Sequence, residues 1–456
     1  MPDEEHAVFG IFKPAPHKEP IKDRRKVRKA YRYWQIRIMI GMYVGYALYY
    51  FTRKNLVIAL PGMMENLGYT MTDLGWVLSL WSIMYAVSKF TSGMLADRSN
   101  PRTFMAIGLI ATGALNLIFG TSASIWMLGI IWGLNGWFQG WGWPPSGRLL
   151  MHWYSQKERG RWWALWNTSH NVGGALIPLL AGWAIAIFGG WQWAFYIPGI
   201  IGIIGGSFLL WSLRDTPQSL GLPSIEEYSG EESQEVAKEH ERELSVKEIL
   251  FKYVLSNRYI WFLAFASFFV YVVRQAVNDW TPAYLVQHQG LGITLSGLFV
   301  TVFEVGGLCG SLAAGWLSDL VFKGRRGPVN VFFGVGIMGS VAAFYFLSGI
   351  APWIGLASMF SLGFFIFGPQ MMIGMAAAEL SHKKAVATAT GFAGFFAYIG
   401  ASVAGAPIAA IQGAWGWGGY FLTVAACSAL VVALLLPTWS ARRREETQLE
   451  EAAEIA

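Results

Sequence analysis

IMIGMYVGYALYYFTRKNLVIALPGMM, residues 38–64, is an almost wholly apolar stretch that contains two adjacent cations, Arg53 and Lys54. On an ideal helix Arg53 lies roughly 22 Å from Ile38 and 16 Å from Met64. An arginine at that depth of a bilayer costs a few kcal/mol or more, so it normally faces an aqueous cavity and serves a function. The stretch therefore predicts a transmembrane helix that carries a functional charge.

Composition extends this prediction to the whole chain of 456 residues, of which 54% are hydrophobic and 14% are charged. Soluble domains carry about a quarter charged residues. Apolar stretches of bilayer length, roughly 20 residues each, recur throughout. We predict an all-α membrane protein with twelve transmembrane helices at 36–63, 74–95, 103–121, 124–147, 162–187, 191–212, 257–285, 292–318, 328–348, 352–379, 386–411 and 416–437.

The basic residues indicate the orientation of these helices. Lysines and arginines gather in the N-terminal tail (1–35), in alternate short loops and after the last helix, whereas the intervening loops contain none. This bias predicts a membrane protein with both termini in the cytoplasm. The N-terminus has no apolar core, so we expect no cleavable signal peptide. The net charge of +6 then reflects topology in the lipid bilayer and not nucleic-acid binding.

A long polar segment, residues 213–256, divides the chain and is strongly acidic in part. Such a composition is typical of a solvated linker. We therefore expect an N-terminal six-helix half at 36–212, a cytoplasmic linker at 213–256, a C-terminal six-helix half at 257–437 and a cytoplasmic tail at 438–456.

Two motifs recur in the two halves at nearly the same spacing. GMLADRSNPR (93–102) and GWLSDLVFKGRR (315–326) share a G-x-L-x-D pattern, which places Asp97 and Asp319 in equivalent positions. Such a repeat predicts equivalent halves. The two aspartates act either in conformational gating or in helix capping and loop ion pairs, and neither interpretation makes them ligands.

The second repeated motif contains the buried arginine. Tyr50-x-x-Arg53 recurs as Tyr271-x-x-Arg274. Pseudo-symmetric halves of this kind are the plan of the major facilitator transporters, in which the substrate site lies midway between the halves. Two guanidinium groups, one from each half, suit a tetrahedral dianion such as phosphate.

The alternative is that a carboxylate neutralises each arginine permanently. Three acidic residues of the second half are candidates for that role: Asp279, Glu304 and Glu379. We favour a charge-tuning role for Glu304 over direct contact with an anionic substrate. Glu304 would form salt bridges with the cations when the site is empty and release them when substrate arrives. We assign charge tuning to Asp279 and Glu304.

Further polar residues occur on apolar helices beside the two arginines. Tyr50 and Tyr271 share the arginines' helix faces. Lys54 is turned about 100° from Arg53 and lies at the cavity edge or pairs with a carboxylate. Lys89, one turn after Tyr85, faces the cavity or forms a salt bridge.

His170 is either a packing residue or a phosphate ligand. Asn171 and the Gly173-Gly174 pair beside it allow close helix approach and leave room for a ligand. Trp143, before Pro144-Pro145, and Phe367, before Gly368-Pro369, predict broken helices 4 and 10. Trp143 is included among the substrate-binding candidates.

Several long stretches resemble the organophosphate:phosphate antiporter family, among them YALYYFTRKN, GWFQGWGWPPSGRLL, WNTSHNVGGALIP and FGPQMMIGMAAAELSHKKA. The resemblance runs from about Phe9 to Arg442. It implies that the two arginines bind phosphate, and that the site is lined by Lys89, His170, Tyr46, Tyr50, Tyr271 and Tyr398. No catalytic constellation or metal cluster is apparent in the membrane segments, so we expect neither an enzyme nor a cofactor.

ALWNTSHNVGGALIP, AVNDW and GFFAYIGASVAG are most similar to the hexose-phosphate subgroup of that family, and Phe367 departs from the glycerol-phosphate branch. The resemblance implies exchange of glucose 6-phosphate, a hexose 6-phosphate, for inorganic phosphate by alternating access. Two alternatives remain open. One is a hexose-phosphate sensor with little net transport and a membrane histidine kinase as partner; the other is an antiporter of glycerol 3-phosphate or phosphoglycerate.

Overall fold

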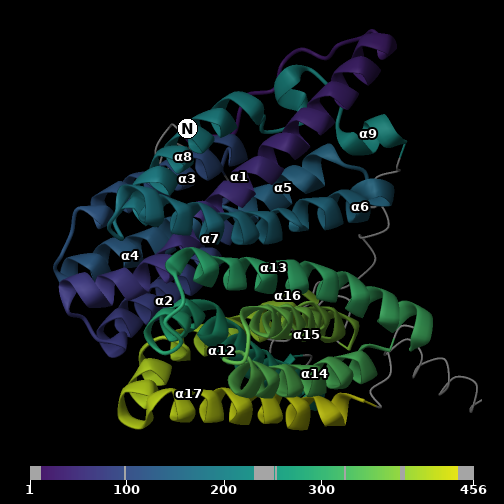
Figure 1. Cartoon of the computed structure of the whole chain (residues 1–456). Coiled ribbons are helices and arrows are strands. Elements are labelled where there is room, and N and C mark those ends of the chain that lie inside the picture. The colour runs from purple at the N-terminus through teal and green to yellow at the C-terminus, as the bar shows by residue number, and fades with distance from the viewer. Residues whose placement is uncertain are drawn as a thin grey trace, which may run out of the picture. The chain divides into compact units, whose positions relative to one another are not determined.

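The computed structural model describes residues 12–96, 99–230, 251, 254–322, 325–380 and 386–439 (Figure 1). Within these ranges the regular structure is helical and contains no strand. Asp97 lies outside the described residues, and so does the side chain of Asp319. The two predicted roles of these aspartates therefore stay predictions.

The chain forms two compact units. Unit 1 comprises Met1–Leu56 and Met84–Glu241, and unit 2 comprises Val57–Ile83 and Arg242–Ala456. The first two helices therefore contribute to both units. α1 (Arg24–Leu67) enters unit 2 after Leu56, and α2 (Met71–Ala96) leaves it at Ile83.

Unit 1 is completed by helices that follow α2 in the chain. α3 begins where the Asn100 side chain accepts a hydrogen bond from the Arg102 N–H and where Pro101 occupies the first turn, because proline needs no N–H partner there. α3 and α8 pack along each other. The helices are α3 (Pro101–Gly120), α4 (Ile125–Gln139), α5 (Trp143–Trp153), α6 (Gln156–Asn167), α7 (Ser169–Phe188), α8 (Trp193–Ser212) and the short α9 (Ile225–Ser229).

Unit 2 is built mainly from long apolar helices. α13 packs closely on α15, and α12 packs on α16 and α17 (Figure 1). The bounds are α12 (Arg258–Gln287), α13 (Ile293–Trp316), α14 (Arg326–Leu347), α15 (Pro352–Glu379), α16 (Val386–Val403) and α17 (Ala406–Leu435). α17 is interrupted at Gly416, whose φ of 65° is a conformation that glycine adopts without strain. The loop predicted between the last two spans lies at this interruption.

Eight helical segments in the described part of the chain are long and apolar enough to cross a membrane. α1 is not among them, since Arg53 and Lys54 interrupt its apolar run, and α4 has only 15 residues. The last of the eight, Ala389–Thr438, contains most of α16 and all of α17. The predicted class of all-α membrane protein is thus confirmed, while the number of twelve spans is not fully established.

Helix breaks differ in part from those predicted. The break before Pro144 is confirmed, because α4 ends at Gln139 and α5 begins at Trp143. The break predicted at Pro369 is wrong, since α15 runs through it as one helix. A proline inside a membrane helix removes one N–H donor, and neighbouring helices stabilise the segment that contains it. A break at Thr168, between α6 and α7, was not predicted.

The residues before α1 are anchored to unit 1. The Lys18 N–H donates to the Gln218 carbonyl at 3.0 Å, and the Ala15 N–H donates to the Asp215 carboxylate at 2.8 Å. Asp215 also forms an ion pair with Arg148, at 3.2 Å. The Asp215 side chain thereby contacts both the N-terminal segment and the middle of α5. We call the end of unit 1 at which α1 begins, with Arg24 and Arg25, the basic end.

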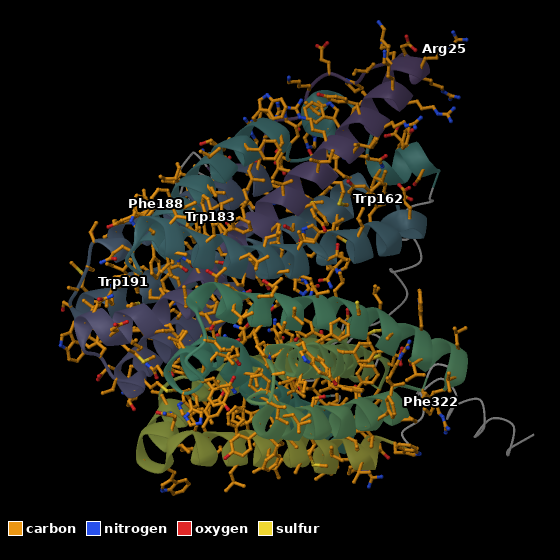
Figure 2. All side chains as sticks on the ribbon, in the orientation of Figure 1. Arg25, Trp162, Trp183, Phe188, Trp191 and Phe322 are labelled. Atoms are coloured by element: carbon orange, nitrogen blue, oxygen red, sulfur yellow. The ribbon has the colours of Figure 1, made fainter. Side chains whose placement is uncertain are left out.

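Large aromatic side chains remain exposed near helix ends. Trp126, Trp316 and Trp353 each expose more than two thirds of their surface. Figure 2 shows the exposed Trp183 and Phe188 toward one end of unit 1 and Arg25 at the other. Exposed tryptophans at helix ends are typical of the two interfaces between membrane and water. Their placement agrees with a multi-pass membrane protein.

The connection between α1 and α2 is locally stabilised within unit 2. The Thr70 hydroxyl and backbone N–H donate to the Asp73 carboxylate at 2.7 and 2.9 Å, and these bonds lower the pKa of Asp73. Farther along α2, the Ser79 hydroxyl donates to the Ser402 carbonyl at 2.6 Å and accepts from the Ala406 N–H. α2 is therefore tied directly to the α16–α17 junction.

Candidate substrate site

In unit 1 the cation of Arg53 lies among aromatic rings. Its guanidinium carbon is 5.0 Å from the centre of the Tyr50 ring, one turn back on α1, and 4.9 Å from that of Tyr85 on α2. Both tyrosines are buried, and Arg53 is half-buried. Cation–π attraction orients the guanidinium without neutralising its charge. This arrangement brings together three of the predicted site residues.

A second cation, Lys89 on α2, lies beside this group. Lys89 lies one turn after Tyr85, and its ammonium is 5.1 Å from the centre of the Trp143 ring at the start of α5. Lys54 is also buried, with its ammonium 6.0 Å from the centre of the Tyr50 ring. Three cationic side chains thus lie near aromatic rings in one unit.

The predicted residues of α7 contact the same tyrosine. The His170 and Tyr50 rings are 5.8 Å apart, and the His170 Nδ1 meets the Asn167 carbonyl at the break between α6 and α7. Gly173 has no room for a side chain, because the backbone of Ala47 on α1 lies against it. Gly173 therefore allows the close helix approach that the sequence predicted, and the structure adds that the neighbouring helix is α1.

Asn171 presents a buried polar group. Its side chain is 4% exposed, and its amide nitrogen has no hydrogen-bond partner within the described part of the chain. A buried donor without a partner is costly, so such groups often mark a ligand or water position. Tyr46, also predicted, packs against Tyr50 at 5.9 Å and against Trp166 at 4.8 Å.

A buried network of side-chain amides supports α1 at the level of Arg53. The Asn55 amide donates to Asn116 at 2.7 Å and to the Ala194 carbonyl at 2.8 Å. The Thr52 carbonyl accepts from both Asn116 and Asn135. The sequence argument missed these residues, although asparagines inside the apolar α3 and α4 were a visible signal. Their bonds fix the backbone from which Arg53 projects.

We predict that Asn116→Leu lowers the stability of the protein. The substitution removes one of the two acceptors of the Asn55 amide and one donor to the Thr52 carbonyl, at a cost of about 1–2 kcal/mol. Thermal unfolding of the purified protein, followed by intrinsic fluorescence, measures this effect. An unchanged melting temperature would contradict a supporting role for the network.

In unit 2 the guanidinium of Arg274 is buried, with 6% of the residue exposed. Its carbon lies 4.7 Å from the centre of the Phe367 ring on α15 and 5.8 Å from that of Tyr271 on α12. The Tyr271 ring in turn packs edge-on against Tyr398 of α16, 5.8 Å away. The three predicted residues of this unit, Tyr271, Arg274 and Tyr398, are therefore brought together, and Phe367 joins them.

No carboxylate among the described residues forms an ion pair with Arg274. Its Nε is buried and makes no hydrogen bond in that part of the chain. A buried cation without a counter-ion is costly by several kcal/mol in most settings. Anions bound at this position would therefore gain both charge neutralisation and charge-assisted hydrogen bonds.

The three acidic residues considered as its counter-ion have other surroundings. Glu379 pairs with Arg326 at 3.1 Å. The Asp279 carboxylate accepts hydrogen bonds from Gln275, at 2.7 and 2.8 Å, and from Asn278. Glu304 is fully buried on α13. None of these three carboxylates forms an ion pair with Arg274 among the described residues.

The described part of the chain contains no group of three or more histidine, cysteine, aspartate or glutamate side chains that could hold a metal ion. The two sets of residues instead present cations, tyrosine hydroxyls and ring faces. Such groups bind an anion that carries an organic portion.

Comparison with known proteins identifies the family of this chain. The family model of the Major Facilitator Superfamily matches residues 42–405. A probable hexose phosphate transport protein of Chlamydia trachomatis is 52% identical over 441 residues, which cover 94% of this chain and 96% of the relative. The membrane sensor protein UhpC of Escherichia coli K12 is 47% identical over 437 residues, which cover 95% of this chain and 99% of the sensor.

A solved structure supports the fold. A bacterial homologue of the human lysosomal transporter Spinster, inward-facing and unoccupied, matches with a TM-score of 0.67 at 15% identity, over 89% of this chain and 93% of that one. The chain therefore belongs to the major facilitator superfamily, and within it to the organophosphate:phosphate antiporter family. It is a multi-pass membrane transport protein and not an enzyme.

Proposed function

We propose that this protein exchanges a hexose 6-phosphate, such as glucose 6-phosphate, for inorganic phosphate across a bacterial inner membrane, with both termini in the cytoplasm. The observation that carries the proposal is the buried guanidinium of Arg274, which has no ion-pair partner among the described residues. The relatives named for hexose phosphate transport support the choice of sugar phosphate.

In this proposal one phosphate group recruits Arg53 from unit 1 and Arg274 from unit 2. Their pairing rests on the matched Tyr-x-x-Arg motifs and on the similar aromatic surroundings of the two guanidinium groups. Lys89, His170 and Asn171 supply further donors in unit 1. A carrier without its anion keeps buried positive charges that no substrate neutralises. Such a carrier reorients poorly, so exchange is obligatory.

We expect purified protein in proteoliposomes loaded with phosphate to take up labelled phosphate, and glucose 6-phosphate to compete at lower concentration than glycerol 3-phosphate or phosphoglycerate. A pyranose ring adds apolar and hydroxyl contacts that the smaller compounds lack. Stronger competition by glycerol 3-phosphate or phosphoglycerate would assign the protein to one of those substrates instead.

A sensor is the second candidate function, because the similarity to UhpC covers nearly the whole of both chains. A sensor with a histidine kinase partner would bind glucose 6-phosphate but catalyse little exchange. Binding measured by calorimetry, alongside the exchange assay, distinguishes the two functions. Binding without exchange would support the sensor and contradict the antiporter.

A further inference from the structure

A cavity of about 590 Å³ in unit 1 is bordered by Trp143, the residue whose ring lies next to the Lys89 ammonium. It is lined from α5 by Trp143, Gly147, Arg148 and His152, among others, and from α6 by Trp163. This volume lies within the range of roughly 300–1,000 Å³ that is usual for small-molecule sites. The cavity therefore has room for the organic part of a sugar phosphate.

Trp143 joins the cavity to the proposed phosphate-binding cations. Its ring lies 5.1 Å from the Lys89 ammonium and 5.8 Å from the Trp163 ring, measured to ring centres. A phosphate held by Lys89 would lie next to Trp143, whose ring also borders the cavity and packs on Trp163. The path from cation to cavity runs entirely through unit 1.

The charges around the cavity favour a neutral occupant. Arg148 is the charged residue of the lining, and its guanidinium pairs with the buried Asp215 at 3.2 Å and donates to the Ser99 carbonyl at 2.6 Å. Because its charge is already compensated, it offers little to a second phosphate. Polar atoms of Arg148 and His152 suit hydroxyl groups, and the two tryptophan faces suit the C–H faces of a pyranose.

We propose that this cavity, which we call the sugar cavity, holds the hexose ring, and that Trp163 determines specificity for hexose over smaller phosphates. The inference rests on the proposed function and adds the place of the sugar. Inorganic phosphate has no group that reaches Trp163. Loss of this ring should therefore change sugar phosphate binding relative to phosphate binding.

Trp162 provides a matched control. It is adjacent to Trp163 on α6, but its ring packs on Tyr154 at 5.1 Å, and it is not among the described residues that line the cavity. Figure 2 places Trp162 toward the basic end of unit 1, where Arg25 also lies. Replacing either tryptophan removes a similar area, so a general loss of packing would affect both variants alike.

The test is calorimetric titration of the purified full-length protein with glucose 6-phosphate and with inorganic phosphate. For Trp163→Leu we expect the ratio of the Kd for glucose 6-phosphate to the Kd for phosphate to rise about tenfold, as for a binding-site tryptophan. For Trp162→Leu we expect no change in this ratio. An unchanged ratio in Trp163→Leu, or an equal rise in both variants, would overturn the inference.

A second variant keeps the test decisive if Trp163→Leu does not fold. Gly147 borders the cavity, and a Cβ atom added there has one neighbour within 4 Å, the Trp163 ring at 3.6 Å. Gly147→Leu should therefore occupy the sugar cavity while both tryptophans remain, and it should raise the same ratio. If the wild-type protein binds phosphate but not glucose 6-phosphate, the proposed function itself fails. If it binds both and neither variant changes the ratio, only the sugar cavity is refuted.

Discussion

Arg274→Lys is expected to reduce phosphate exchange at least about 100-fold. Lysine keeps the positive charge but lacks the planar fork that donates two hydrogen bonds to adjacent phosphate oxygens. Its ammonium would also lose the extended contact with the Phe367 ring, now 4.7 Å from the guanidinium carbon. The measurement is uptake of labelled phosphate into phosphate-loaded proteoliposomes, normalised to the amount of reconstituted protein.

Arg258→Lys is the matched control on the same helix. Arg258 is exposed at the first position of α12, where it donates to the Tyr259 hydroxyl. Exchange should be close to wild type in this variant, because its guanidinium lies at the helix end. Near-normal exchange by Arg274→Lys would contradict the account, and equal losses in both variants would indicate a general defect of α12.

Gly310→Val is expected to have the largest effect on folding. A side chain at Gly310 on α13 would overlap the carbonyl of Phe364 on α15, which is backbone and cannot rotate away. α13 and α15 would have to separate, and overpacking of this kind costs about 3 kcal/mol or more. We expect a much lower yield of folded protein by size-exclusion chromatography and a lower melting temperature.

Gly315→Val tests whether the effect depends on this contact. Gly315 lies on the same helix, and a side chain added there meets nothing within 4 Å. Both variants carry the same cost of placing valine in a helix. Similar melting temperatures for the two variants would show that disruption of the α13–α15 contact does not cause the loss of stability in Gly310→Val.

The sequence predicted the parts of the site that follow from helical spacing. Tyr50 and Arg53 are three residues apart, as are Tyr271 and Arg274, so each pair shares a helix face, and both pairs are in contact. Long apolar runs likewise predicted most of the helices. These signals are local, because they depend only on residues within one or two turns.

Features that depend on packing between helices were not predictable in the same way. Phe367 contacts Arg274 from α15, and this contact is possible because Gly307 on α13 leaves room for its ring. The surroundings of the acidic residues, such as the pairing of Glu379 with Arg326, are also set by distant segments. Nor does any local signal show that Val57–Ile83 packs with unit 2.

The measurement that tests the central claim most directly is a double-mutant cycle on phosphate binding. Calorimetry on wild type, Arg53→Lys, Arg274→Lys and the double variant gives four binding free energies. If both arginines hold one phosphate, the two substitutions must be coupled, so the loss in the double variant differs from the sum of the single losses by at least about 0.5 kcal/mol. Losses that add within error would contradict a shared anion.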